Sequence, residues 1–184
     1  MERVYQSILS HLDFDGKGQI LDVGCGSGAL SIRAALVWPQ ARVLGIDAWP
    51  PAYNYSQRMC EKNAESEGVA VLCRFQRGDA NKLDFPDGRF DAVVSNYVYH
   101  NITGADRQAL LLETLRVLKK GGVFALNDEM KPRLYGDMEA FAQKLRDMGY
   151  EDVRLIDTAT EAFGSCRRAA MMMLGASRML VGRK

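Results

Sequence analysis

The sequence predicts a doubly wound α/β fold with a mostly parallel, seven-stranded sheet and an antiparallel strand near the C-terminus. Short apolar runs alternate with segments of helical periodicity along most of the 184 residues, as in proteins that cover a parallel sheet with helices on both faces. Glycines occupy every second position directly after the first apolar run. No clear long helix separates the last two apolar runs, residues 152–157 and 177–183, so we expect an antiparallel feature at the sheet edge.

Each expected element has a local signal. Pro39 ends the second helix, and Gly68 ends the third, which begins with prolines suited to a first turn. Lys119 and Lys120 are expected in the last turn of the fourth helix, where cations suit the dipole, with Gly121 just after it. The patterns predict strands at 18–23, 41–47, 69–75, 90–96 and 123–128, and helices at 4–12, 29–38, 50–68, 104–122 and 136–150.

The composition is that of an ordinary globular protein. Hydrophobic residues make up 47% and charged residues 26%, with a net charge of +1, so no broad charge favours nucleic acid or acidic membranes. No run of about 18 apolar residues predicts a membrane span, and residues 1–12 lack the apolar core of a signal peptide. Four scattered cysteines and two histidines show no metal-binding spacing. These features favour a reduced, cytoplasmic location and no metal.

The chain shows no repeat, linker or low-complexity segment, so we expect one domain over residues 1–184. Within it we expect a short N-terminal helix in 1–18 and a cofactor-binding core in 19–128. Residues 129–184 should supply a C-terminal helix and the edge strands.

The stretch "ILDVGCGSGAL", residues 20–30, places Gly24, Gly26 and Gly28 between a strand and a helix. Glycine in such a turn lets backbone N–H groups approach a ligand at a helix N-terminus. A purely structural turn is the alternative. The motif alone does not separate different nucleotide-like cofactors, because dinucleotide-binding proteins share much of it.

Two aspartates follow the next two predicted strands. Asp47 lies about 20 residues after the glycines, where an acidic side chain can accept hydrogen bonds from a ribose diol. Asp79 could accept from an adenine amine, and the N–H of Ala80 could meet a ring nitrogen. Capping and turn chemistry are the structural alternatives for the two carboxylates. The order of these features at successive strand ends favours a cofactor site.

These residues resemble the class I S-adenosylmethionine (SAM)-dependent methyltransferases, in the branch related to ubiquinone and menaquinone C-methylases. The resemblance is close over residues 19–128 and rests on "ILDVGCGSGAL", "VLGIDAW", "RGDANKLDFPDGRFDAVVSNYVYHNI" and "LRVLKKGGVFALND". It implies a Rossmann-like fold, SAM as cofactor, S-adenosylhomocysteine as product and a small-molecule acceptor. The implied cofactor-binding residues are Asp22, Gly24, Cys25, Gly26, Gly28, Asp47, Ala48, Asp79, Ala80, Asn96 and Tyr97.

Two other function classes remain open at this point. An NAD-dependent oxidoreductase would fit the relaxed glycine fingerprint, although Asp22 and the "GDA" after the third strand argue against it. A SAM-binding module without catalysis would share every cofactor motif and convert no substrate.

The acceptor side is less well defined. His100 is a candidate general base at the mouth of the expected site, or else a loop histidine with local hydrogen bonds. Tyr97 and Tyr99 could wall the pocket or pack in the core, and Asn127 and Asp128 are weaker candidates. "SNYV" replaces the Asn/Asp-Pro-Pro-aromatic motif of the amino-methylating branches, which together with the net charge of +1 argues against nucleobase N-methylation. We expect no nucleic-acid substrate, and the alternative of RNA or protein modified at other groups stays open.

The methionine run within residues 166–180 is expected to serve as core or as a subunit contact, such as that of a homodimer, more than as a pocket lining. The loops after the fourth and fifth strands are short, and about 18 residues precede the first strand. We therefore expect a well-formed cofactor pocket whose acceptor side is open to solvent.

Overall fold

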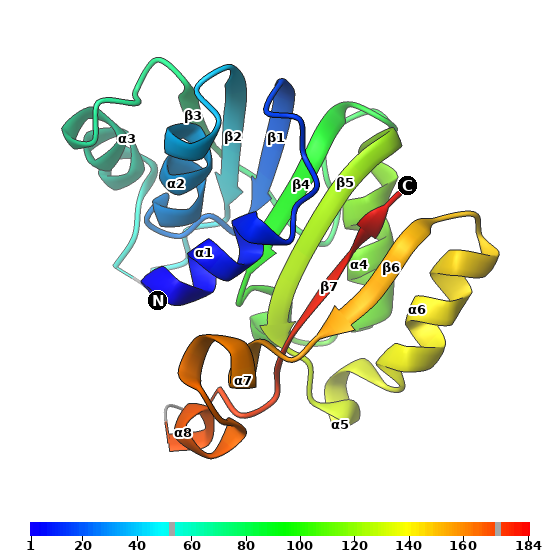
Figure 1. Ribbon diagram of the computed structural model, residues 1–184. Coiled ribbons are helices and arrows are strands. Elements are labelled where there is room, and N and C mark those ends of the chain that lie inside the picture. Colours follow the sequence, from blue (N-terminus) through cyan, green and yellow to red (C-terminus); the bar gives the residue numbers. More distant parts are fainter. Residues whose placement is uncertain (52–53, 172–173) are drawn as a thin grey trace.

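A single seven-stranded sheet forms the centre of the computed structural model, which describes residues 1–51, 54–171 and 174–184 (Figure 1). The spatial order of the strands is β3-β2-β1-β4-β5-β7-β6. The predicted fold is therefore confirmed. The strands are β1 (Gly18–Val23), β2 (Ala41–Asp47), β3 (Cys73–Arg77), β4 (Phe90–Asn96), β5 (Leu118–Glu129), β6 (Glu151–Ile156) and β7 (Ser177–Arg183).

The strand order reverses at β1, which pairs in parallel with β2 on one side and with β4 on the other. Residues of β1 are fully buried at Ile20, Leu21 and Val23, which explains the nearly continuous apolar run in the sequence. Ligands of open α/β sheets bind beyond the carboxyl ends of the strands at such a reversal. The fold thus places the glycine loop at the expected ligand position.

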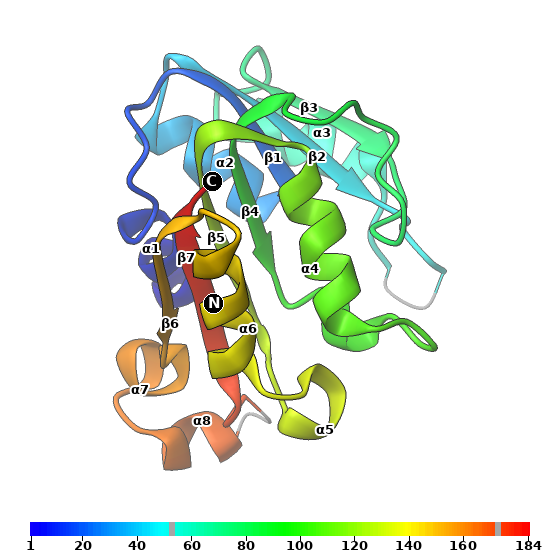
Figure 2. The ribbon, with the colours of Figure 1, turned by 90° about the vertical axis from the view of Figure 1, so that its right-hand side faces the viewer.

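Helices cover both faces of the sheet (Figures 1 and 2). The first hydrophobic core takes side chains from α1, α2, α3 and α7, and the second from α4, α5 and α6. A 3₁₀ turn, η1, follows β4. The bounds are α1 (Glu2–Ser10), α2 (Ala29–Val37), α3 (Gln57–Ser66), η1 (Tyr99–Asn101), α4 (Arg107–Arg116), α5 (Pro132–Tyr135), α6 (Met138–Asp147), α7 (Thr158–Phe163) and α8 (Cys166–Met171).

The C-terminal strand β7 lies between β5 and β6 and runs antiparallel to both. The antiparallel strand was expected, but β6 rather than β7 forms the sheet edge. The order 3-2-1-4-5-7-6 also differs from the all-parallel 3-2-1-4-5-6 order of dinucleotide-binding dehydrogenases. The fold therefore disfavours the NAD-dependent alternative.

The expected fourth helix is too long. The helix α4 ends at Arg116, and Lys119, Lys120 and Gly121 belong to β5 because Leu118 already pairs with Phe90 of β4. The cation at the carbonyl end of α4 is instead Lys184, whose Nζ donates to three backbone oxygens: those of Leu115, Arg116 and Leu118, at 2.8, 3.1 and 2.9 Å.

The expected third helix and third strand also shift. The helix α3 starts at Gln57 because the Ser56 side chain caps it by accepting from the Met59 N–H. Residues 52–53 of the expected helix lie outside the described residues. Val69 accepts from Leu72 N in a turn, so β3 starts at Cys73 rather than at 69. In the described parts of the chain, no helix has the length and apolarity needed to cross a membrane.

Candidate cofactor site

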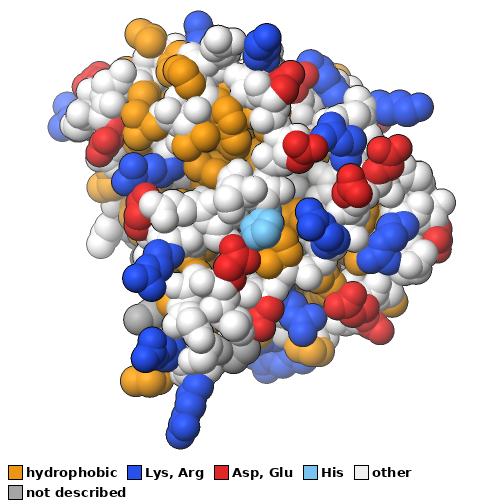
Figure 3. All heavy atoms as spheres, viewed as in Figure 1, with side chains coloured by type: hydrophobic (Ala, Val, Ile, Leu, Met, Phe, Trp, Pro, Cys, Tyr) orange, Lys and Arg blue, Asp and Glu red, His pale blue; other side chains and the backbone are white. Residues whose placement is uncertain are grey.

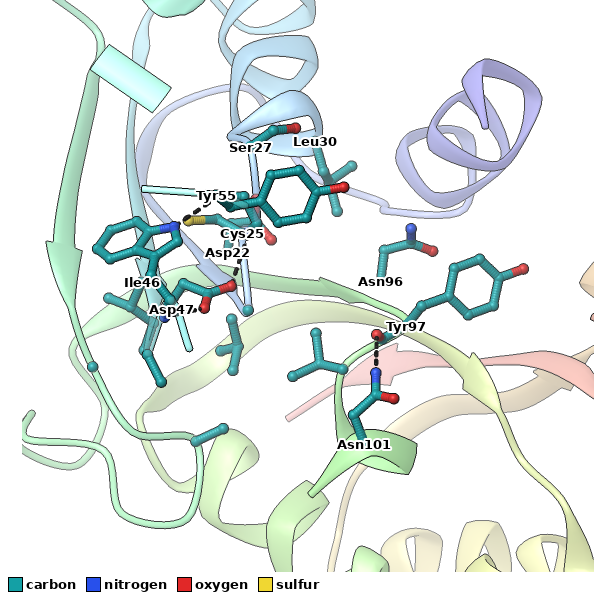
Figure 4. Close-up of a pocket in the computed structure, with 18 of the residues that line it drawn as sticks. Asp22, Cys25, Ser27, Leu30, Ile46, Asp47, Tyr55, Asn96, Tyr97 and Asn101 are labelled. Atoms are coloured by element: carbon teal, nitrogen blue, oxygen red, sulfur yellow. Dashed lines mark hydrogen bonds between the residues drawn. The ribbon is translucent and has the colours of Figure 1, made fainter. Parts of the chain in front are cut away.

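A cleft of about 490 Å³ lies beyond the carboxyl ends of β1, β2 and β4 (Figure 4). It brings together most of the predicted cofactor-binding residues: Asp22, Gly24, Cys25, Gly26, Asp47, Ala48, Asp79, Ala80, Asn96 and Tyr97. Two predicted site residues, Gly28 and His100, are not among those that line it. Met1 and Tyr55, 54% and 48% exposed, lie at its rim.

The three glycines of the loop are required for different reasons. All three have positive φ, but a Cβ on Gly24 would lie 2.2 Å from the Val98 side chain. A Cβ on Gly28, the N-cap of α2, would meet Phe75 at 3.0 Å. A Cβ on Gly26 would meet only the Tyr55 ring, at 3.7 Å. Packing therefore explains Gly24 and Gly28, whereas at Gly26 the missing side chain leaves space in the cleft for a ligand.

Side chains from later elements hold the loop by its carbonyl groups. Trp49 Nε1 donates to the Gly26 oxygen at 2.8 Å, and Cys60 Sγ lies 3.2 Å from the same oxygen. Asn63 Nδ2 donates to the Ser27 oxygen at 2.9 Å. Sequence reasoning missed Trp49, Cys60 and Asn63, because only the folded chain brings α3 and the turn after β2 beside the loop.

Asp47 at the end of β2 is fixed by two backbone N–H groups. Its Oδ2 accepts from Gly26 at 2.9 Å and its Oδ1 from Trp49 at 2.7 Å. Each carboxylate oxygen can accept more than one hydrogen bond. The carboxylate is thus held in a defined position in the cleft with acceptor capacity left for hydroxyl groups.

Asp22 at the end of β1 is buried and accepts from the Ser31 hydroxyl at 2.6 Å. Burial raises the pKa of Asp22 to about 7. The Ser31 hydrogen bond lowers this pKa, and the nearby negative charge of Asp47 raises it further. The Asp22 carboxyl therefore changes charge near neutral pH, and a cation in the cleft would favour its ionised form.

Asp79 and Ala80 line the cleft after β3. Asp79 Oδ1 accepts from the backbone N and the side-chain Nδ2 of Asn81, at 2.8 and 2.7 Å. This is the turn chemistry that was the structural alternative for this residue. Because the same residue also lines the cleft, the turn serves to orient the carboxylate there.

The end of β4 contributes Asn96 and Tyr97, across the cleft from Asp47 and Cys25 (Figure 4). Tyr97 has a φ of 57°, and its hydroxyl pairs with Ser177 Oγ at 2.8 Å. Tyr99, the other candidate wall residue, is fully buried on the opposite face of the sheet and pairs with Thr114. The turn after β4 breaks the alternation of the strand, so Tyr99 belongs to the core.

His100 lies beside the cleft rather than in its lining. Its Nδ1 contacts the carboxylate of buried Asp128, and its ring is 6.4 Å from that of Tyr97, which does line the cleft. The Asp128 carboxylate also accepts the backbone N–H groups of Tyr99 and Glu129. An imidazole that donates from Nδ1 leaves Nε2 free to accept a proton. Asn127, the other candidate, lies within β5, is buried and donates to Asn96.

The methionine run is only partly described. Met171 ends α8 and is 85% exposed, so of the two expected roles, core residue or subunit contact, it does not have the first. Met172 and Met173 lie outside the described residues. Over the described ranges, no group of three His, Cys, Asp or Glu side chains is arranged to hold a metal ion.

Comparisons with known proteins identify the family of the chain. The methyltransferase-domain family matches residues 21–126. The chain is 32% identical over 132 residues to the demethylmenaquinone methyltransferase of Symbiobacterium thermophilum, covering 71% of this chain and 50% of that protein. It is 34% identical over 117 residues to a ubiquinone/menaquinone biosynthesis C-methyltransferase of Desulfotalea psychrophila, covering 64% of this chain and 44% of that protein. The chain thus spans about half the length of these curated relatives.

Among solved structures, the [4+2]-cyclase SpnF superposes with a TM-score of 0.74 at 21% identity, covering 100% of this chain and 81% of that chain. This likeness supports the fold, and the match over residues 21–126 supports the family. The chain therefore belongs to the class I SAM-dependent methyltransferase family, in the branch that includes the ubiquinone and menaquinone C-methyltransferases.

Proposed function

We propose that the chain is a SAM-dependent methyltransferase that acts on a small-molecule acceptor. The observation that carries this proposal is the cleft at the strand-order reversal, where Gly26 leaves space for a ligand beside the Asp47 carboxylate that its N–H group holds in place. When bound, SAM supplies a methyl group on a sulfonium, whose departure leaves a neutral thioether. The chain itself has to hold the acceptor aligned and exclude water, which can lower the barrier by several kcal/mol.

The residues of the cleft fit the parts of SAM. In this proposal, Asp47 and Ala48 bind the ribose, and Asp79 and Ala80 bind adenine. The glycine loop, with Asp22 beneath it, holds the methionine part. Asn96 and Tyr97 lie at the methionyl end, next to the acceptor side. The charged side chains among the described lining residues are Asp22, Asp47 and Asp79, without Lys, Arg or His, which suits a cationic cofactor.

The aromatic side chains suit the reacting end. Tyr5, Tyr55 and Tyr97 line the cleft, and an aromatic face attracts a cation such as a sulfonium. Burial raises the pKa of both Tyr5 and Tyr97, so these rings stay neutral near physiological pH. Neutral rings can border the acceptor without adding charge.

His100 is the proposed general base for an acceptor that must lose a proton. Asp128 holds Nδ1, so that Nε2 is the nitrogen that accepts the proton. Because His100 borders Tyr97 rather than the cleft itself, this role requires the acceptor to lie over the Tyr97 ring.

A SAM-binding module without methyl transfer is the second candidate. One observation favours keeping it: a [4+2]-cyclase has the same fold at 21% identity, so the fold alone does not require methyl transfer. A screen of metabolite pools with methyl-labelled SAM separates the two. An enzyme transfers label to an acceptor and releases S-adenosylhomocysteine, whereas a module binds both ligands and converts neither.

We also propose a cellular location and an oligomeric state for the protein. A cytoplasmic location is supported by the free thiols of Cys25, Cys60 and Cys73. The expected lack of nucleic-acid substrates is supported by the net charge of +1 and by the interspersed charges on the face in Figure 3. A homodimer contact is supported by the exposed Met171 at the end of α8. Sedimentation of the purified chain tests the homodimer, and a DNA and RNA binding assay tests the nucleic-acid expectation.

A further inference from the structure

A buried polar network behind the cleft connects the C-terminal part of the chain to the proposed cofactor site. Its members are Asn127 of β5, Thr158 of α7 and Ser177 of β7, which are at most 1% exposed. None of the three lies within residues 21–126, the segment that matches the family. Such a network must satisfy its hydrogen bonds internally, because buried polar groups without partners are costly.

The network ends on two residues of the cleft. Asn127 Nδ2 donates to Asn96 Oδ1 at 2.8 Å, and the Asn127 backbone oxygen accepts from Tyr97 N at 2.9 Å. Ser177 Oγ pairs with the Tyr97 hydroxyl at 2.8 Å. The positions of both Asn96 and Tyr97 therefore depend on residues far away in the sequence.

The hydrogen bonds of the network have a direction. Thr158 Oγ1 donates to Asn127 Oδ1 at 2.7 Å. With its oxygen occupied, the Asn127 amide turns its NH₂ group toward Asn96 and donates to the Asn96 oxygen. The NH₂ group of Asn96 is then left for the cleft, where the residue lies opposite Asp47 (Figure 4). An amide NH₂ offers two donors and no acceptor.

A donor of this kind in the cleft can bind the carboxylate of the cofactor. The amino-acid end of SAM carries a carboxylate, and no Lys, Arg or His is present among the described lining residues. Among the described lining side chains, a neutral amide such as that of Asn96 can donate to that carboxylate. We propose that Thr158 and Asn127 are positioning residues that turn the Asn96 NH₂ group toward the carboxylate of the bound ligand. This inference rests on the proposed function, because it assumes that the cleft binds SAM.

The test compares two ligands that differ at the amino-acid end. S-adenosylhomocysteine has the α-amino and carboxylate groups, whereas 5′-methylthioadenosine has the same adenosine and thioether without either group. Calorimetry measures both ligands on the wild-type chain and on Thr158→Val, which removes the donor hydroxyl and keeps the shape. We expect Thr158→Val to bind S-adenosylhomocysteine about tenfold more weakly and to bind 5′-methylthioadenosine as the wild type does.

Two variants sharpen the comparison. Thr158→Ser restores the hydroxyl and should restore the affinity for S-adenosylhomocysteine. Thr114→Val removes a comparable buried hydroxyl, the partner of Tyr99 on the opposite face of the sheet, and should change neither affinity. Melting curves check that each variant folds. If Thr158→Val does not fold, Asn96→Asp replaces the amide by a carboxylate at the cleft and should weaken only S-adenosylhomocysteine.

The outcomes are distinct. Selective weakening with rescue by serine supports the positioning role. Unchanged binding of S-adenosylhomocysteine, or equal weakening of both ligands, would overturn it while leaving the proposed function intact. A folded wild-type chain that binds neither ligand would overturn the proposed function and this inference together.

Discussion

The Asp47 carboxylate accepts the backbone N–H of Gly26 at 2.9 Å and so joins the end of β2 to the middle of the glycine loop. The Trp49 indole closes the same loop from the other side by donating to the Gly26 oxygen at 2.8 Å. Both polar groups of the Gly26 backbone are thereby held by residues at the end of β2 and just after it. The proposed ribose-binding carboxylate and the loop beside it form one structural unit.

Replacing Asp47 by alanine should weaken the binding of SAM and S-adenosylhomocysteine. The variant loses a charged acceptor for the ribose and also frees Gly26, and hydrogen bonds to charged groups contribute about 1.5–3 kcal/mol. Calorimetry measures the change. Asp84→Ala is the matched control, because Asp84 is exposed and does not line the cleft. Equal affinity of a folded Asp47→Ala chain would remove the ribose assignment.

Replacing Gly26 by valine should abolish cofactor binding in a chain that still folds. The Cβ at this position would meet only the Tyr55 ring, so the added methyl groups fill the cleft rather than the core. Positive φ makes any side chain strained here. Gly149→Val controls for that strain, because Gly149 also has positive φ and open space around it. Full affinity in the Gly26→Val chain would contradict the close-approach role of the loop.

Stability should depend on pH through Asp22. Its pKa is raised from 3.8 in an unfolded chain to about 7 in the folded one, so folding takes up protons between these values. The resulting stabilisation is complete below about pH 4 and is lost as the pH rises through about 7, at up to roughly 1.4 kcal/mol per pH unit.

Asp22→Asn cannot titrate, and its amide oxygen can still accept from Ser31. Urea unfolding from pH 4 to pH 8 should therefore show the variant gaining stability relative to the wild type as the pH rises. Parallel curves for the two proteins would show that Asp22 has an ordinary pKa.

His100→Ala should lower turnover on the acceptor found by the labelling screen and leave SAM affinity unchanged. The reason is that His100 lies outside the cofactor cleft but has its Nδ1 held by Asp128. The other histidine of the chain offers a control, because His11 pairs with Glu161 at 3.1 Å instead. If His100→Ala and His11→Ala turn over equally fast, His100 is a structural loop residue.

Local patterns were sufficient to predict much of the sheet. The bounds of β1, β2 and β4 agree with the apolar runs at 18–23, 41–47 and 90–96, because these strands are buried and bounded by glycine, proline or polar residues. The predicted end of α4 was wrong because more than one lysine of the sequence can bind the carbonyl groups at the end of this helix. Lys119 and Lys120 are close to the helix in the sequence. Lys184, which binds the carbonyl groups at the end of α4, is brought there by the pairing of β7 with β5.

The site was predictable where it follows strand ends and not where it depends on distant contacts. Asp47 and Asp79 could be placed because one is the last residue of a strand and the other lies two residues after a strand end. Cys60 and Asn63 could not, because they reach the glycine loop only through the packing of α3 beside it. In a strand pattern, Tyr97 and Tyr99 would lie on the same face, so the sequence does not show which of them lines the cleft. The positive φ of Tyr97 breaks this alternation.

The most direct test of the central claim is a calorimetric titration of the purified chain with SAM, S-adenosylhomocysteine and NAD. The cleft of about 490 Å³, with Asp22, Asp47 and Asp79 in its lining, predicts that SAM and S-adenosylhomocysteine each bind one molecule per chain and that NAD does not bind. A folded chain that binds NAD, or that binds neither SAM nor S-adenosylhomocysteine, would contradict the account.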